Sequence, residues 1–295
     1  DSTAETFLSA VKDSPHPELA TMIDHPSARV VARYVGALGV PLVDAGRFVR
    51  ATGERLHGLV NDHGGTVLTG HEVLSTSPTT GGLWSSRLRR RSDGVEFEQL
   101  SKAVAIATGG HQPLDRLVTQ RVGGVALVSE VGDRLMQSDE ALSLGGPAKI
   151  ADLLSTRRNP KIVIIGGSTS AIATIVLLLK TASIPFGAGA ISLLHREPLR
   201  PFYPTPEAAR AEGFTDFGPE DICPVSGFVY RLAGFRLEAR ELVLRMLRID
   251  GRTPDPRLTV HQVTGDDDPV TRAHLAEADI VIAALGYRPR ALPIQ

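Results

Sequence analysis

The spacing of hydrophobic residues predicts helices at the start of the chain. Apolar positions recur at helical spacing over residues 3–11 and 26–38, and prolines separate the two pieces. A longer helix is predicted to run from an N-cap at Asp44 to about Asp62, with its apolar side chains on one face. The Gly64–Gly65 pair is expected to end it. Helices are therefore expected to precede the first strand.

Strands are predicted over the following forty residues. Residues 66–77 alternate polar and apolar side chains, and residues 83–100 have the pattern of a hairpin with Asp93–Gly94 at its turn. The continuous apolar run AVAIAT, residues 103–108, predicts a buried strand that ends at a glycine pair. The sequence up to residue 158 is then less regular, with one helix expected near 148–155.

From residue 161 onward, strands and helices alternate. Helices are expected at 168–180 and within 229–247. Apolar runs predict strands at KIVII (161–165), ISLLHR (191–196), RLTVHQV (257–263) and DIVIAALG (279–286). Strand–helix–strand repetition is typical of an α/β fold with a parallel sheet. We therefore predict two domains, residues 1–155 and residues 156–290, the second with a Rossmann-like parallel sheet.

Composition narrows the classes of function. The net charge of −1 over 295 residues gives no field that favours nucleic acid, so no nucleic-acid partner is expected. No run of apolar residues approaches a membrane span and no leader is evident, so no membrane partner is expected and the cytoplasm is the default location. The single cysteine, Cys223, excludes an intramolecular disulfide and a redox-active cysteine pair, and no metal site is expected. The oligomeric state stays open.

The segment KIVIIGGSTSA, residues 161–171, carries the most chemical information. A buried strand leads into Gly166, and a helix begins within a few residues, which is the setting of a dinucleotide-binding turn. In the G-x-G-x-x-G/A pattern the middle glycine is replaced here by serine. The alternative is a strand–turn–helix that binds nothing. The residues expected to bind the cofactor are Gly166, Gly167, Ser168, Thr169, Ser170 and Ala171.

The end of the next strand bears on the choice between NADPH and NADH. An arginine at this position suits the 2′-phosphate of NADPH, whereas an acidic residue hydrogen-bonds the ribose of NADH. The sequence places Arg196 there and Glu197 immediately after it. Arg196 is therefore predicted to bind the cofactor and favours NADP, while Glu197 keeps NADH open as the alternative.

Three segments together resemble a known family. AVAIATGGHQP and ADIVIAALGYRP each end a strand at a glycine, at Gly109 and Gly286, and GGSTSA lies between them. In this order they resemble the flavoproteins with two dinucleotide-binding domains. In those proteins, Ala-Thr-Gly segments mark the crossings, the two points at which the chain passes between the FAD domain and the inserted NAD(P) domain. Within that group, GGSTSA and ADIVIAALGYRP resemble segments of the class B flavin monooxygenases and the amino-acid N-hydroxylating monooxygenases. Leu285 stands where that family has threonine.

The resemblance implies cofactors and a domain arrangement. Residues 1–155 would be part of an FAD-binding α/β domain, and residues 156–290 an NAD(P)-binding domain inserted into it. The cofactors implied are FAD and NADP. The crossing residues Thr108, Gly109, Gly286 and Tyr287 would contact them. The family also implies that the terminal FAD-binding segments, including an FAD fingerprint, are missing from this chain.

The resemblance further implies an enzyme, an oxidoreductase of the flavin-dependent monooxygenase class. It would use NADPH and FAD to hydroxylate a substrate through a flavin hydroperoxide. The more specific prediction is N-hydroxylation of a small amine or amino acid. No catalytic residue is predicted, because the flavin supplies the chemistry. The alternatives are a flavin-dependent NAD(P)H reductase that delivers electrons to a carrier and a non-catalytic nucleotide-binding module.

A long segment, residues 196–231, follows the strand that ends near Arg196. It is interpreted either as a lid or substrate element or as a packed, proline-stiffened connection. The N-hydroxylase resemblance suggests Arg200 and Arg210 as ligands of a substrate carboxylate. Cys223, in the same segment, is expected to pack beside Pro224 rather than to react.

Overall fold

The computed structural model describes residues 3–37, 39–289 and 291–294, and its contacts divide the chain into two compact units. Gln112–Gly286 form one, called here the inserted unit. The residues up to His111 and those from Tyr287 onward form the other, called the flanking unit. The predicted division into domains of residues 1–155 and 156–290 stays a prediction. In the two compact units, residues 112–155 pack with the parallel sheet rather than with the N-terminal helices.

A five-stranded parallel sheet forms the centre of the inserted unit, which confirms the predicted α/β fold. In spatial order its strands are β10 (Leu258–Gln262), β9 (Ile191–His195), β8 (Ile162–Ile165), β11 (Ile280–Ala283) and β7 (Leu135–Gln137). Each neighbouring pair is parallel. Every residue of β8, β9 and β11 is buried, as expected for parallel strands that are covered on both faces. The continuous apolar runs of the sequence reflect this burial.

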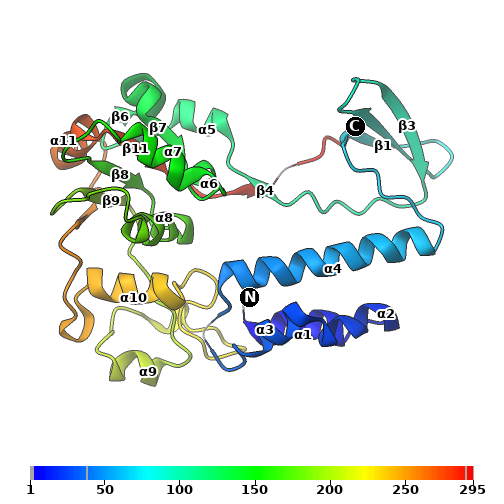
Figure 1. Cartoon of the computed structure of the whole chain (residues 1–295), viewed down its shortest axis with the longest axis horizontal. Coiled ribbons are helices and arrows are strands. Elements are labelled where there is room, and N and C mark those ends of the chain that lie inside the picture. The colour runs from blue at the N-terminus through cyan, green and yellow to red at the C-terminus, as the bar shows by residue number, and fades with distance from the viewer. Residues whose placement is uncertain (1–2, 38, 290, 295) are drawn as a thin grey trace. The chain divides into compact units, whose positions relative to one another are not determined.

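Helices cover both faces of this sheet (Figure 1). One core joins Ile162 and Ile164 of β8 to α8 (Thr169–Lys180), α10 (Leu237–Met246) and α7 (Gly146–Leu153). The opposite core joins Val163 and Ile165 to α5 (Leu114–Thr119) and α11 (Pro269–Glu277). If β8, β9, β10 and β11 are numbered 1 to 4 along the chain, their order across the sheet is 3-2-1-4. Successive strands are therefore added on one side of β8 up to β10, and β11 is added on its other side. The order 3-2-1-4 is that of the first four strands of the Rossmann fold.

Two predicted elements of the inserted unit differ in extent. The helix near 148–155 is present as α7, but the helix predicted within 229–247 begins only at Leu237. The residues before it pair with an upstream segment instead: Val229 bridges to Tyr203 and Phe235 bridges to Pro201. Val229 and Phe235, two of the apolar residues that suggested a helix, are buried there, whereas Leu232 is exposed.

Further short elements complete the inserted unit. A hairpin of β5 (Arg121–Val122) and β6 (Val125–Ala126) turns through Gly123 and Gly124, both at positive φ, and leads into a π-helical turn, Leu127–Val131. The remaining short elements are the 3-10 turn Gly132–Arg134, α6 (Ser138–Ala141), α9 (Pro206–Ala211) and the 3-10 turns Pro219–Asp221 and Ile249–Gly251.

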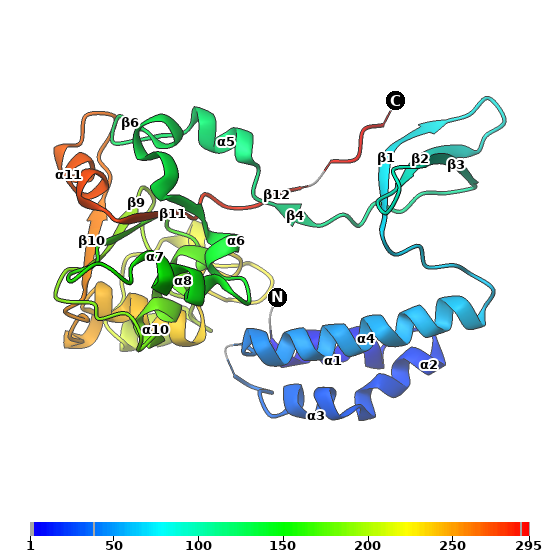
Figure 2. The same cartoon turned by 45° about the horizontal axis from the view of Figure 1, so that its top comes forward.

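Helices form the first part of the flanking unit, as predicted (Figure 2). They are α1 (Ala4–Lys12), α2 (Pro17–Ala20), a 3-10 turn (Thr21–Asp24), α3 (Pro26–Ala32) and α4 (Leu42–Asp62). A shared core of buried side chains includes Val11, Val31 and Phe48. The N-cap of α4 is Pro41 rather than the predicted Asp44. Asp44 lies in the first turn, where its carboxylate accepts a hydrogen bond of 2.9 Å from the Tyr34 hydroxyl and is thus engaged away from the helix end.

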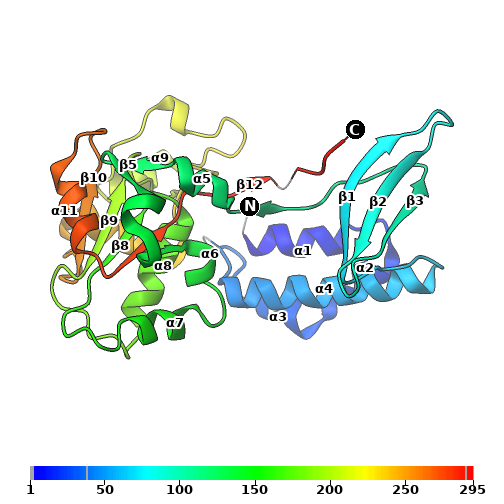
Figure 3. The same ribbon diagram turned by 90° about the horizontal axis from the view of Figure 1, so that it is seen from above.

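An antiparallel sheet of three strands follows (Figure 3). Its strands are β1 (His71–Pro78), β2 (Trp84–Arg90) and β3 (Glu96–Ser101), which confirms the predicted strand and hairpin. The turn between β2 and β3 contains Gly94 at a φ of +75°, a conformation that glycine adopts without steric cost.

The predicted buried strand at 103–108 is wrong. These residues belong to no strand in the described part of the chain, and five of the six are exposed. An apolar run becomes a strand only where another strand accepts its backbone hydrogen bonds. Pairing begins just after this run, where β4 (Gly110–His111) meets β12 (Arg288–Pro289) in antiparallel register.

Candidate functional site

A pocket of about 340 Å³ opens at the carboxyl ends of the parallel strands of the inserted unit. Its walls are the segments that follow four strands and one upstream segment: Gly166–Ser168 after β8, Arg196 and Glu197 after β9, Val263, Gly265 and Asp266 after β10, Ala284–Gly286 after β11, and residues 116 and 120–123. Open α/β sheets bind ligands at their carboxyl edge, where the strand order reverses. The pocket includes that point, between β8 and β11.

Close packing explains the first glycine of the turn. Gly166 has a φ of +130°, which other residues rarely adopt, and a Cβ built on it would lie 2.3 Å from the Ala284 carbonyl oxygen. At Gly167 the nearest atom to a built Cβ is the Glu197 carbonyl oxygen at 3.4 Å. The turn therefore requires glycine at 166, because the backbone of β8 leaves the sheet directly against the segment after β11.

The start of α8 faces this pocket without a side-chain cap. Ser168 is the N-cap residue, but its hydroxyl donates to the Ala284 carbonyl oxygen at 3.3 Å instead of accepting from the helix. The first turn also has no acidic residue. The backbone N–H groups at the start of a helix carry partial positive charge and bind anions when nothing else satisfies them. The geometry thus favours an anionic group at the turn.

The remaining predicted residues of the turn lie differently. Thr169, Ser170 and Ala171 do not line the pocket. Ala171 is fully buried in the core between α8 and the sheet, which is the packing role of the last small residue in the fingerprint. The Ser170 carbonyl oxygen accepts a hydrogen bond from the Thr174 hydroxyl at 2.8 Å. Their contribution to cofactor binding stays a prediction.

Arg196 and Glu197 both line the pocket at the end of β9. Their backbone is fixed: the Gln262 amide donates to the Arg196 carbonyl oxygen at 3.0 Å, and His195 Nδ1 lies 2.9 Å from the Glu197 carbonyl oxygen. Their side chains form an ion pair of 3.4 Å but remain 82% and 70% exposed. An ion pair this exposed contributes little, so it does not prevent Arg196 from binding a phosphate.

A buried carboxylate holds the segment between β10 and α11, which forms another wall. Asp268 is 2% exposed and caps α11 by accepting from the Thr271 N–H at 2.9 Å. It also accepts from the Thr264 N–H at 3.1 Å and lies 2.8 Å from His261 Nε2. Burial alone would raise the pKa of Asp268, but hydrogen bonds from Thr271, His261 and Thr264 hold it well below the ordinary value. The aspartate is therefore ionised and fixes the segment beside Gly265 and Asp266.

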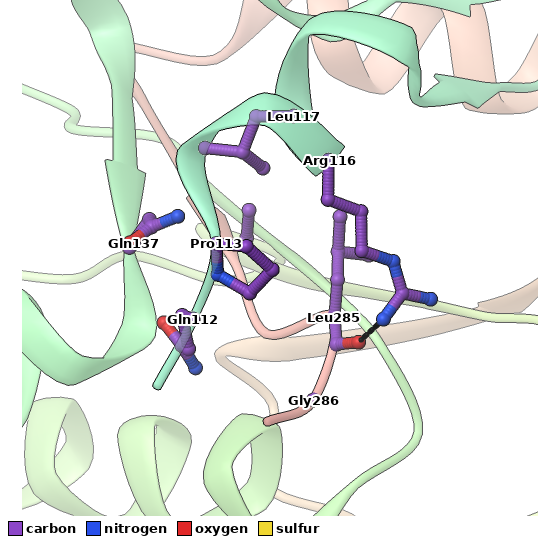
Figure 4. Close-up of a pocket in the computed structure, with 8 residues that line it drawn as sticks. Gln112, Pro113, Arg116, Leu117, Gln137, Leu285 and Gly286 are labelled. Carbon is purple, nitrogen blue, oxygen red and sulfur yellow. Dashed lines mark hydrogen bonds between the residues drawn. The ribbon is translucent and has the colours of Figure 1, made fainter. Parts of the chain in front are cut away.

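Residues 116 and 120–123 of the pocket come from upstream of the sheet. Arg116 of α5 donates from Nη1 to the Leu285 carbonyl oxygen at 2.9 Å, as Figure 4 shows in the small neighbouring cavity that Arg116 also lines. Arg116 was not among the predicted site residues, because residues 111–158 show no regular pattern. Asp268 was not among them either, although a signal was present: an aspartate directly before a proline is typical of an N-cap.

The predicted crossing residues are divided between the two units of the chain. Gly286 belongs to the inserted unit and lines the pocket, because it lies in the segment after β11. Thr108, Gly109 and Tyr287 belong to the flanking unit, and Thr108 and Gly109 lie outside its strands. Their contact with a cofactor stays a prediction.

The long segment after Arg196 is packed. Tyr203, Phe214 and Val229 are buried in a core of their own with Leu244, which favours the packed connection over the lid. The guanidinium of Arg200 lies 5.4 Å from the centre of the Tyr230 ring, and that of Arg210 lies 5.2 Å from the centre of the Phe217 ring. Neither arginine lines the pocket, so their role as substrate ligands stays a prediction.

Cys223 lies in a polar setting. Hydrogen bonds from Ser226 and from Arg231, whose Nη1 is 3.4 Å from the sulfur, lower the pKa of the Cys223 thiol to about 6. The thiol is thus more acidic than simple packing beside Pro224 would make it. Among the described residues, no group of three or more histidine, cysteine, aspartate or glutamate side chains is arranged to hold a metal ion.

A search of the helices in the described ranges finds none with the length and hydrophobicity to span a bilayer.

The chain is similar in structure to a solved protein, whereas its sequence matches no known family. No protein family model matches the chain, and no curated protein sequence does. Among solved structures, it is similar to FAD-bound DfoA, the cadaverine monooxygenase of the desferrioxamine biosynthetic pathway from Erwinia amylovora. The two share 13% sequence identity, the match covers 75% of this chain and 54% of DfoA, and the TM-score is 0.42. The chain thus spans about half the length of that protein.

Proposed function

We propose that the inserted unit binds a nicotinamide dinucleotide across the carboxyl edge of its parallel sheet. The observation that supports this most is the packing of Gly166 against the Ala284 carbonyl oxygen, which brings the uncapped start of α8 to the pocket. The pyrophosphate would lie at this helix start, where backbone N–H groups are available. A cavity of about 340 Å³ is within the range of small-molecule sites.

We further propose that the preferred cofactor is NADPH. Arg196 lies at the end of β9, next to the position where the cofactor ribose is bound in this fold. Its exposed guanidinium is available to a 2′-phosphate, and the fixed backbone beneath it limits the entropy lost on binding.

Replacing Arg196 with glutamine tests this preference. We expect R196Q to bind NADP⁺ about tenfold less tightly while its affinity for NAD⁺ changes little, because only NADP⁺ has the 2′-phosphate. Isothermal titration calorimetry of both cofactors gives the two dissociation constants. E197Q is the matched control: it removes the adjacent charge and is expected to bind NADP⁺ at least as tightly as the wild type. An equal loss for both cofactors in R196Q would contradict the assignment.

For the whole protein, we propose an FAD- and NADPH-dependent monooxygenase that hydroxylates a small amine or amino acid on nitrogen. The support is the sequence resemblance, in which the order of three segments agrees with the family, together with the inserted arrangement of the units. FAD would supply the oxygen chemistry when bound. In the described part of the flanking unit, no strand leads through a glycine turn into a helix, so we assign no FAD-binding residue there.

A visible spectrum of the purified intact gene product tests the monooxygenase proposal. We expect bound flavin that is reduced by NADPH without oxygen and that forms a lasting oxygen adduct when air is admitted. Immediate reoxidation without an adduct would favour a reductase that delivers electrons to a carrier. A protein without flavin would leave the nucleotide-binding unit as the function.

A further inference from the structure

The structure assigns Arg116 a role in the proposed cofactor site: we propose that its guanidinium binds the pyrophosphate of the dinucleotide. This inference rests on the proposed function of the pocket. Arg116 is supplied by α5, about fifty residues before the glycine turn, and so lies outside the fingerprint that identifies the site.

Two contacts connect Arg116 to the glycine turn through the segment after β11. Arg116 Nη1 donates to the Leu285 carbonyl oxygen at 2.9 Å. The carbonyl oxygen of the preceding residue, Ala284, accepts from the Ser168 hydroxyl at 3.3 Å and packs against Gly166. The guanidinium is therefore held beside the part of the pocket where the start of α8 favours an anion.

Three arginines, Arg116, Arg121 and Arg196, line the pocket, and their ion pairs differ. Within the described part of the chain, no carboxylate lies within ion-pair distance of the Arg116 guanidinium, whereas Arg121 pairs with Glu130 at 3.9 Å and Arg196 pairs with Glu197 at 3.4 Å. The two acidic residues of the pocket, Glu197 and Asp266, follow β9 and β10 rather than β8 and β11. At the end of the pocket formed by β8 and β11, Arg116 therefore provides positive charge that no lining carboxylate offsets.

The geometry of Arg116 also suits a phosphate ligand. The side chain is half-buried, and its hydrogen bond to a backbone carbonyl fixes the guanidinium in place. A guanidinium has five N–H donors, so a bond to Leu285 leaves donors for phosphate oxygens. A charge that is partly removed from water and already ordered loses less entropy and is screened less when the anion binds.

The test separates a pyrophosphate contact from a 2′-phosphate contact. R116Q removes the charge but keeps an amide donor, and we expect it to bind NADP⁺ and NAD⁺ about tenfold to a hundredfold less tightly, by the same factor for both. Binding of 2′-AMP, which has the 2′-phosphate but no pyrophosphate, should stay unchanged. Titration calorimetry on the 295-residue chain measures all three, and circular dichroism confirms the fold.

Arg134 offers a matched control, because its Nη1 also donates to backbone carbonyl oxygens in the inserted unit, those of Leu275 and Ala278, yet it does not line the pocket. R134Q is expected to bind both cofactors like the wild type. Should R116Q not fold, R116K carries the test: lysine keeps the charge but not the planar fork, so both cofactors should bind several-fold less tightly.

The outcomes are distinguishable. A wild-type chain that binds neither NADP⁺ nor NAD⁺ overturns the proposed function. A folded R116Q, or R116K in its place, that binds both cofactors as tightly as the wild type overturns the role of Arg116 and leaves the proposed function intact. A loss for NADP⁺ and 2′-AMP alone also overturns it, because the contact would then be to the 2′-phosphate.

Discussion

Replacing Gly166 with alanine is expected to abolish dinucleotide binding and to lower the free energy of unfolding of the inserted unit by about 3 kcal/mol. Two effects combine at this position. A φ of +130° is strained for any residue with a side chain, and the added methyl group would lie 2.3 Å from the Ala284 carbonyl oxygen. Relief of that clash requires the β8 turn or the segment after β11 to move, and both are walls of the pocket.

Chemical denaturation and calorimetric titration with NADP⁺ measure the two effects of G166A. The matched control is Gly187→Ala in the loop before β9, where a built Cβ meets no atom within 4 Å and φ is not in the left-handed region. G187A is expected to keep the stability and affinity of the wild type, because alanine fits there without strain. A G166A protein with wild-type stability and NADP⁺ affinity would refute the structural requirement for glycine.

Replacing Asp268 with alanine is expected to lower the free energy of unfolding by about 3 kcal/mol, because it removes a helix cap and leaves buried donors without an acceptor. The donors are the N–H groups of Thr264 and Thr271 and the ring of His261. The segment beside Gly265 should loosen as well, so NADP⁺ should bind less tightly. Thermal unfolding and NADP⁺ titration measure these losses.

The neighbouring Asp267 gives the control for this change. Its side chain is 91% exposed and pairs with Arg272 at the surface, so D267A should alter stability by less than about 0.5 kcal/mol. Equal stabilities of D268A and D267A would contradict the assignment of the buried carboxylate.

The low pKa of Asp268 also predicts a dependence of stability on pH. The pKa is lower in the folded chain than in the unfolded chain, so the carboxylate contributes its full stabilisation above the unfolded value, about 3.9. That contribution is lost as the pH falls towards the folded value. The melting temperature of the wild type should therefore fall more steeply below pH 4 than that of D268N. Parallel curves for the two proteins would contradict this.

Prediction from the sequence succeeded where the pattern was local. The strands at Ile162–Ile165, Ile191–His195 and Ile280–Ala283 were detectable because parallel strands covered on both faces require continuous apolar runs. The run at 103–108 is also continuous and largely apolar, but it belongs to no sheet in the described chain, because pairing depends on a neighbouring strand and not on the run itself. The strand Leu135–Gln137 was missed because three residues show no period and are ordered by pairing with β11.

The residues of the candidate site also fall into two groups, those that a local sequence pattern predicts and those that long-range contacts bring to the pocket. Gly166, Gly167, Ser168 and Arg196 follow strands that the sequence reveals, so their places in the pocket were predictable. Arg116 lies 169 residues from Leu285, whose carbonyl oxygen it contacts, and Asp266 reaches the pocket from the segment that Asp268 holds. Such contacts depend on the order of strands in the sheet, which the sequence pattern does not specify.

The pairing of β4 with β12 has a consequence for how such a protein is assembled. The chain enters the inserted unit just after Gly110–His111 and leaves it just before Arg288–Pro289, and these two segments are hydrogen-bonded to each other. The 175 residues from Gln112 to Gly286 are therefore connected to the flanking unit in the way a single loop is, with its two ends next to each other. The entropy of closing a loop grows only with the logarithm of its length, and the ends of a folded insert are already close together. An inserted unit of this kind can be gained, lost or exchanged at one antiparallel strand pair while the fold of the flanking unit is kept.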